Sequence, residues 1–446
     1  MRKLYRISST LLASLLAVQA AIARDASSPA LPAALPREDA MFPSQPDDRA
    51  LRWSLIYTGD ANADVSGGAR TGAAYLHRIG LIGEWDLARA FGWRGARAHV
   101  SVHAIAGTGL SAQRTGNVLT VSGVEAEPAL RLFNLWIERK LGERVTLRAG
   151  QFNADQDFVL SPTAAHMVNS TFGWPGSFAS DLPSGGPAYP LATPGLSLAV
   201  AATPQTSLRM AVFAGDPGGP GSGDPQRRNL NGFNGFHFKG RPFLIGELRH
   251  AAKEADPAWS LVLGGWVHFD RFDDLRVDRA GTSLAAPEAF GAPRSHLGNL
   301  AIYAIADARL ASISGRALHG FLRATASPAD RNPIDLYADA GLTLSGPFRH
   351  RQDDTLALGL AFARISPRLR ALHRDSCARA GARCRTPVGE MVIEASYQIK
   401  LRDDLTLQPD VQLIVHPSAA LLGDPMALRA GPGNALIIGL RTSFRL

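Results

Sequence analysis

Charged, amide and aromatic side chains recur at alternate positions of segments that are otherwise apolar. The candidates found in this way are Arg97, His99, Trp136, Glu138, Arg148, Glu394, Gln398, Gln408 and Asp410, with His103, Trp266, His268, Asp270, Asp335 and Asp339 beside them. Carboxylates, amides and guanidinium groups exchange hydrogen bonds with hydroxyl groups, and aromatic rings pack on apolar ring faces. The set therefore predicts a wall suited to neutral sugars. The alternative, which we favour for any single residue, is that these charges pair with one another and stiffen the wall.

The same residue types do not predict catalysis or a metal site. His99 and His103 share one face of an extended chain but lie about 13 Å apart at about 3.3 Å per residue, which is too far for one ion. The sequence has no Gly-x-Ser-x-Gly, P-loop or His-Glu-x-x-His motif. No nucleophile with a neighbouring base is apparent either. We therefore expect no catalytic residue, no metal and no cofactor.

Cys377 and Cys384 are the two cysteines of the chain, and six residues separate them. An exported protein favours a disulfide that closes this short loop. Free thiols are the alternative. A metal site would need more ligands, and we expect no histidine or cysteine pair nearby at a usable spacing.

The elements that carry the candidate residues read as β-strands. At the carboxyl end, Leu436, Ile438, Leu440 and Phe444 alternate with small or polar residues, and a strand shows successive side chains to opposite faces. A Lys or Arg on the lipid face of a membrane barrel costs about 2–4 kcal/mol near the midplane. That cost places the polar face inside a closed barrel and the apolar face against lipid.

The whole pattern predicts an all-β fold, a transmembrane antiparallel β-barrel with about sixteen strands, short periplasmic turns and long extracellular loops. The expected strands are 51–58, 70–88, 94–106, 128–139, 144–152, 193–202, 206–214, 242–251, 258–270, 298–309, 314–325, 334–345, 354–365, 388–400, 404–415 and 434–446. The expected long loops are 107–127, 153–192, 215–241, 271–297, 366–387 and 416–433. A closed barrel is required because an open sheet edge would leave backbone groups unpaired in hydrocarbon.

The longest connection, 153–192, combines five prolines with several aromatic residues, which argues against disorder. We expect it to fold back into the barrel and narrow it. The alternative is a loop packed on the outer rim.

The amino end predicts export. Residues 1–23 have a basic start, a short apolar core and an Ala-Ile-Ala cleavage site, as in a signal peptide. Residues 24–50 are rich in Pro and Ala and read as a flexible periplasmic lead-in, so the barrel domain is 51–446. The apolar core of this signal peptide is too short to span a bilayer, and no later stretch of the chain offers about 18 continuous apolar residues. The expected location is the outer membrane of a Gram-negative cell.

Composition excludes one class of partner and leaves others open. The formal net charge is +8, but the Lys and Arg residues are scattered without a basic patch that interleaves aromatics, so we expect no nucleic acid. Mean hydropathy of −0.03 does not separate a soluble protein from a membrane barrel, because half the strand residues of a barrel face water. A barrel enzyme and an adhesin or receptor barrel are the rival classes.

An ordered set of short motifs resembles the carbohydrate-selective porin family (OprB-like) over residues 52–446. The motifs are Asp86-Leu87, Gly92-Trp93-Arg94-Gly95, Leu135-Trp136-Ile137-Glu138, Arg148-Ala149-Gly150-Gln151, Asp157-x-x-Leu160, Asn169-Ser170-x-Phe172-Gly173, Tyr189-Pro190, Glu394-x-x-Tyr397-Gln398, Leu407-Gln408-Pro409-Asp410-x-Gln412, His416-Pro417 and Gly439-Leu440-Arg441. The resemblance implies passive diffusion of monosaccharides, glucose especially, through a channel narrowed by inward-folded extracellular loops. It adds Gln151, Asp157 and Phe158 to the pore-lining candidates, beside Glu138 and Arg148.

The partners that follow are monosaccharides, outer-membrane lipid and lipopolysaccharide, and the barrel-assembly machinery. A homotrimer and a monomer both remain open. Two departures from the family stand out: the chain ends on Leu446 rather than on an aromatic residue, and 215–300 matches poorly. A general porin, or a porin for another solute, is the alternative function.

Overall fold

The structure is a computed structural model that describes residues 49–232, 240–252, 258–289, 291–313, 315–382, 384, 386–423 and 431–446. The predicted signal peptide and residues 24–48 of the predicted lead-in lie outside the described residues.

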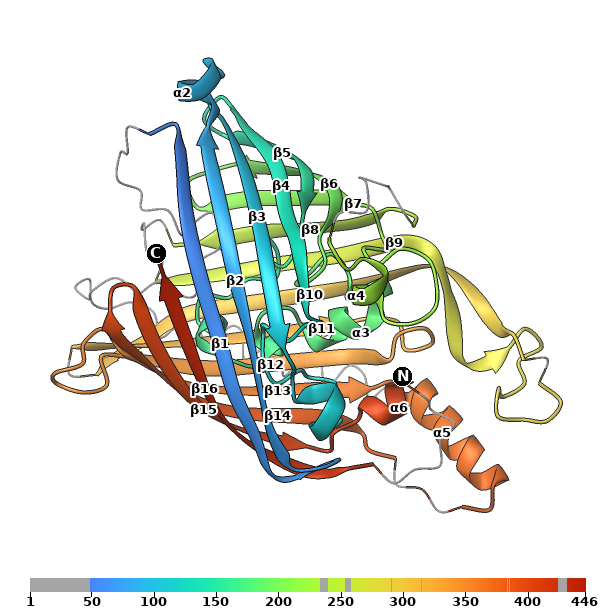
Figure 1. The fold of residues 1–446 in the computed structure, drawn as a ribbon. Helices are drawn as coiled ribbons and strands as arrows, with labels where there is room; N and C mark the ends of the chain where they lie inside the picture. The colour runs from blue at the N-terminus through green and yellow to red at the C-terminus, as the bar shows by residue number, and fades with distance from the viewer. Residues whose placement is uncertain are drawn as a thin grey trace.

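Sixteen antiparallel strands in the described residues close into one barrel, with each strand paired to its neighbours in sequence and β1 paired to β16 (Figure 1). The strands are β1 Leu51–Gly68, β2 Gly72–Asp86, β3 Ala96–Gly107, β4 Ala129–Leu141, β5 Val145–Phe152, β6 Thr193–Ala201, β7 Thr206–Phe213, β8 Phe243–Ala251, β9 Trp259–Asp278, β10 Pro293–Ile313, β11 Arg316–Ala326, β12 Ile334–Ser345, β13 Thr355–Ile365, β14 Gly389–Arg402, β15 Leu405–Val415 and β16 Gly433–Arg445. The closing register pairs Tyr57 with Phe444. The predicted fold class is confirmed.

Helices are short and lie in the connections. They are α2 Leu87–Phe91, α3 Gly176–Asp181, α4 Pro225–Arg228, α5 Pro367–Arg379 and α6 Ala419–Gly423. The carboxylate of Asp86 caps the first turn of α2, and Gly92, with φ of 74°, ends it. Within the described residues, no helix is long and apolar enough to cross a bilayer.

The strand faces follow the sequence alternation. On β15, Gln408, Asp410 and Gln412 are buried, whereas Val411 and Leu413 are exposed on the outside. Because the outward residues are apolar on neighbouring strands as well, the barrel presents an oily outer surface, as a lipid environment requires.

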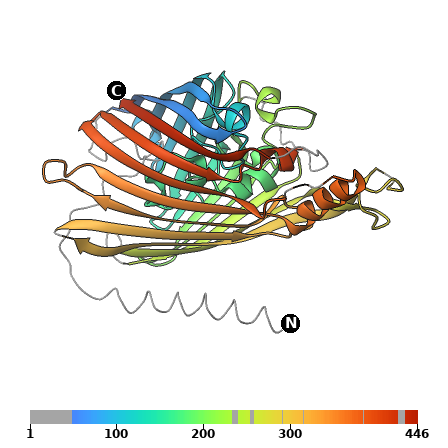
Figure 2. The same ribbon diagram turned by 90° about the horizontal axis from the view of Figure 1, so that it is seen from below.

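Several predicted bounds are wrong. β1 continues ten residues beyond the expected end at 58, through a run of Gly, Ala and Asp that has weak strand propensity. β9 extends to Asp278 and β10 begins at Pro293, so the predicted loop 271–297 is the shorter connection 279–292. The predicted loop 366–387 contains the helix α5, which lies beside β9 beyond the rim of the barrel (Figure 2).

The connections leave a long-loop end and a short-turn end. The short-turn end holds α2 and the carboxyl terminus, whereas α5 and α6 lie at the other end (Figure 1). From the long-loop end, residues 153–192 enter the barrel, where their aromatic side chains pack against the wall. Phe178 contacts both Trp266 of β9 and Tyr303 of β10 at ring-centroid distances of 5.8 and 5.5 Å. The predicted inward fold of 153–192 is confirmed, and the outer-rim alternative is wrong.

Candidate functional site

Five charged side chains form a continuous ladder across the inner wall, which we call the charge ladder: Arg97, Glu138, Arg148, Asp157 and Arg209. The strand register sets Arg97 opposite Glu138 and Glu138 opposite Arg148 on three neighbouring strands. Arg97 Nε donates to Glu138 Oε1 at 2.8 Å, and Arg148 Nη2 donates to Glu138 Oε2 at 2.8 Å.

Asp157 extends this ladder from segment 153–192. Its two carboxylate oxygens accept hydrogen bonds from Arg148 Nη1 and Arg209 Nη1, each at 2.6 Å. All five residues of the ladder line a small pocket of about 140 Å³. Three guanidinium groups thus alternate with two carboxylates, and the five residues of the charge ladder carry a net formal charge of +1.

Trp136 lies beneath the ladder. Its ring stacks on His99 at 4.8 Å with parallel planes, and the guanidinium of Arg148 lies 4.2 Å from its centroid. His99 Nδ1 is 2.7 Å from Glu84 Oε1. Because Trp136 is only 4% exposed, its ring orients the arginines rather than offering a free face to a solute.

The remaining predicted site residues hold the inward segments in place. Glu394 accepts hydrogen bonds from the backbone N–H groups of Val168 and Asn169 at 2.6 and 2.8 Å. Gln398 Oε1 lies 3.0 Å from His166 Nδ1 in the imidazole ring. Gln408 Nε2 donates to the backbone carbonyl oxygen of His166 at 2.8 Å.

Three further predicted residues, Gln151, Phe158 and Asp410, are buried as well. Gln151 donates to the carbonyl oxygen of Gly232 at 2.7 Å. Phe158 is 1% exposed within the aromatic cluster, and Asp410 is buried on β15 beside Gln412. The structure therefore divides the predicted set into a charged ladder that lines a pocket and a group of buried residues that contact the inward segments or pack beside them.

Sequence reasoning missed a fully buried anchor, Arg323 on β11. Its guanidinium pairs with Asp339, which lies opposite it on β12, and also donates to carbonyl oxygens of segment 153–192. Arg323 occupies an inward position between apolar residues, so the alternation contained the signal for its face.

A second inward segment, residues 108–128, was also missed by the residue-level reasoning. Glu390 of β14 accepts hydrogen bonds from the backbone N–H groups of Val118 and Leu119, at 2.9 and 2.7 Å, and of Ser418 at 2.8 Å. Ser122 donates to Asp60 of β1. The two segments therefore lie together inside the barrel.

A cavity of about 550 Å³ lies between these two segments, and we call it the inner cavity. Its lining includes Arg78, Glu125, Phe133, Asn153 and Tyr189. Burial raises the pKa of Glu125 to about 7, although Ser111 donates two hydrogen bonds that oppose the shift. Burial also raises the pKa of Tyr189 to about 12, against the opposing charge of Arg78.

The ion preference of the channel is expected to depend on pH through Glu125. With its pKa raised from 4.5 to about 7, the carboxyl is largely neutral at pH 6 and charged at pH 8. The inner cavity therefore gains a negative charge as pH rises, and cation permeability relative to anions should increase. The contacts that hold Glu125 in segment 108–128 should lose stability as the pH rises from about 4.5 through 7, because the raised pKa favours the protonated acid in the folded state. Reversal potentials at pH 6 and 8 measure the first effect, and Glu125→Gln should abolish the dependence.

Asp157→Asn should make the channel more anion-selective. Within the charge ladder, three guanidinium groups would then face the single carboxylate of Glu138, so the net formal charge of its five residues rises from +1 to +2. Glu84, 3.8 Å from Arg97, lies outside the ladder and is unchanged. A unit charge about 10 Å from the path changes ion energy by about 0.4 kcal/mol in water, roughly twofold in permeability ratio. Reversal potentials in asymmetric KCl provide the measurement. Asp403→Asn, in an exposed turn, is the matched control and should leave the ratio unchanged.

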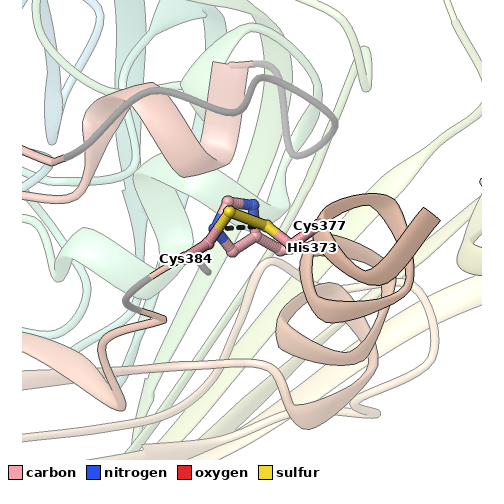
Figure 3. A group of neighbouring side chains, drawn as sticks. All are labelled: His373, Cys377 and Cys384. Atoms are coloured by element: carbon pink, nitrogen blue, oxygen red, sulfur yellow. Dashed lines mark hydrogen bonds between the residues drawn. A yellow bond between two sulfur atoms is a disulfide. The ribbon is translucent and has the colours of Figure 1, made fainter. Parts of the chain in front are cut away.

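The cysteines form a disulfide at the carboxyl end of α5, between Cys377 and Cys384 (Figure 3). One histidine lies beside this disulfide, with His373 Nε2 3.8 Å from Cys377 Sγ. The two residues are four apart on α5, which puts them on one face of the helix. These three residues are the group within the described residues with metal-ligand spacing, but the disulfide engages both sulfur atoms.

The profile of the carbohydrate-selective porin, OprB family, matches residues 70–446. The chain belongs to the OprB family of carbohydrate-selective porins. Porin B of Pseudomonas aeruginosa, a relative, is 22% identical over 428 residues, covering 88% of this chain and 87% of that protein. The resemblance expected from the motifs is confirmed, and OprB-family membership places the chain among outer-membrane porins.

Solved OprB structures share the fold. The high-pH structure of Pseudomonas putida OprB has a TM-score of 0.77 at 21% identity, covering 90% of this chain and 95% of that one. The low-pH structure of the same protein has a TM-score of 0.52 at 15% identity, covering 90% and 93%. At these identities the likeness concerns the fold of the barrel, not individual side chains.

Proposed function

We propose that this OprB-family porin lets monosaccharides such as glucose diffuse passively across the outer membrane. The observation that carries the proposal is the inner cavity, which the two inward segments line together with residues of the wall and which mixes hydrogen-bond donors and acceptors with aromatic side chains. Weak binding at several points along such a wall speeds entry without trapping the solute. The proposal includes no covalent chemistry, no cofactor and no energy coupling.

Liposome swelling with the purified protein tests this function. Glucose should enter faster than a zwitterion of matched size, because only the sugar offers hydroxyl groups all around its ring. Equal rates would contradict the selectivity and favour a general porin. A barrel that inserts without conducting ions or sugars would instead support an adhesin or receptor.

We further propose that residues 1–23 direct export and that the barrel-assembly machinery inserts the mature chain from the periplasm. The long-loop end then faces outward, in contact with lipopolysaccharide. Processing of the precursor at the Ala21-Ile22-Ala23 site, read from the amino-terminal sequence of the membrane-extracted protein, tests the export step. A homotrimer and a monomer both fit the fold, and the mass of the protein in mild detergent separates them.

A further inference from the structure

The guanidinium of Arg78 is unlike the other inward arginines around the cavity. It lies 5.3 Å from the ring centroid of Tyr189, but among the described residues it has no hydrogen bond or ion pair. By contrast, Arg441, which also lines the inner cavity, donates to both carboxylate oxygens of Asp60 at 2.9 and 2.8 Å. Arg78 is half-buried on β2 and so brings an uncompensated positive charge to the cavity.

Asn153 provides the second unused group. It is 1% exposed, lines the same cavity, and neither its amide oxygen nor its amide nitrogen has a hydrogen-bond partner in the described structure. A buried amide without partners costs free energy, which a ligand carrying hydroxyl groups would recover. Hydroxyls suit both of its atoms, because a hydroxyl donates and accepts.

The acids of the cavity already accept hydrogen bonds from protein groups. Asp155 accepts one from the backbone N–H of Tyr189 at 2.8 Å, and Glu125 accepts two from Ser111. Asp224 caps the first turn of α4. These acids make the cavity a poor place for a dianion, but they leave the guanidinium of Arg78 open to a single negative charge.

An aromatic floor, formed by Phe133 and Tyr189, lines the same cavity as the two unused groups. Phe133 and Tyr189 meet edge to face at 5.8 Å, and His103 stacks on Phe133 at 4.5 Å. Tyr189 and Asn153 are linked through the backbone, since Ala154 N–H donates to the carbonyl oxygen of Pro187. The guanidinium, the aromatic floor and the amide therefore belong to one site.

We propose that the inner cavity binds a sugar acid, a polyhydroxylated monocarboxylate of monosaccharide size. Its carboxylate would form a bidentate ion pair with the guanidinium of Arg78, and its hydroxyl groups would form hydrogen bonds with the side-chain amide of Asn153. The cavity volume of about 550 Å³ is ordinary for a small-molecule site. This inference rests on the proposed sugar porin and extends its solutes to anionic sugars.

Planar-bilayer conductance of the purified protein, with D-gluconate and D-glucose as blockers, tests the proposal. The half-blocking concentration of gluconate should be about 10-fold below that of glucose, as a charge-assisted hydrogen-bond pair implies. Arg78→Gln should raise the gluconate value about 10-fold and leave the glucose value within about twofold. Asn153→Ala should raise both values, because both solutes present hydroxyls. Glucose 6-phosphate, a dianion, should block more weakly than gluconate.

The controls separate this site from general attraction of anions. Arg374→Gln removes an equal charge from the exposed face of α5 and should change neither value. Arg78→Lys keeps the positive charge without the bidentate geometry and should lose part of the preference for gluconate over glucose. This variant tests the site if Arg78→Gln does not insert into the membrane. Equal blocking by both solutes in the wild type, or the same loss in Arg374→Gln, would overturn the site while leaving the porin intact. Absence of conductance or block with every solute would instead overturn the proposed function.

Discussion

Arg323→Met should loosen segment 153–192 and raise the single-channel conductance. The side chain is fully buried and its guanidinium joins the wall to the segment by donating to four carbonyl oxygens at 2.8 to 3.0 Å. Those oxygens belong to Val159, Thr171, Phe172 and Gly173. Methionine fills similar space but donates nothing. It also leaves Asp339 as a buried charge without its partner, a loss of about 3–5 kcal/mol.

Single-channel recording and liposome swelling measure the consequence, and preference for glucose over a size-matched zwitterion should fall together with the rise in conductance. Arg364→Met is the matched control, because Arg364 pairs with Asp335 at 2.7 Å but its side chain is 39% exposed. Such a pair contributes about 0–1 kcal/mol, so conductance should stay at the wild-type value. The double variant Arg323→Met/Asp339→Leu removes the unpaired acid but not the missing donors. It should recover stability while conductance remains high, and wild-type conductance in both Arg323 variants would contradict the anchoring role.

The sequence alternation predicts which face a strand residue occupies, but not what it meets across the barrel. Gln408 and Glu394 lie on the inner face, as their alternation with apolar residues requires. Their partners are His166 and Asn169, more than 220 residues away in the chain. That pairing depends on how a closed barrel brings distant strands around one inward segment, and no local pattern encodes it.

Of two errors in the predicted elements, one had a signal in the residues and the other did not. At α5, Ser366 caps a helix that begins with Pro367 and turns Leu369 and Leu372 to one side. This start signal marks a helix where a loop was expected. In β1, by contrast, Asp60, Asn62 and Asp64 alternate with small residues and lack the branched and aromatic side chains that mark a strand. Pairing on both sides, with β2 and β16, stabilises that strand despite its weak local propensity.

Glu390→Ala should release segment 108–128 and widen the inner cavity. The carboxylate is 1% exposed and accepts hydrogen bonds from three backbone N–H groups, those of Val118, Leu119 and Ser418. Alanine would leave three buried donors without an acceptor, at about 1–3 kcal/mol each. Segment 108–128 contributes the cavity wall around Thr120. We therefore expect higher conductance, loss of sugar block, and faster tryptic cleavage after Arg114.

Glu390→Gln provides the graded comparison. The glutamine amide keeps one acceptor oxygen for these backbone N–H groups, but its NH₂ group is a donor and cannot accept from the remaining ones. Conductance and cleavage should therefore fall between those of the wild type and of Glu390→Ala. Asp157→Asn, which leaves the seat of segment 108–128 intact, should not increase cleavage after Arg114. If both Glu390 variants were cleaved at the wild-type rate, the carboxylate of Glu390 would not hold segment 108–128. The hydrogen bonds within the segment and to Asp60 and Asp64 would then be sufficient to hold it in place.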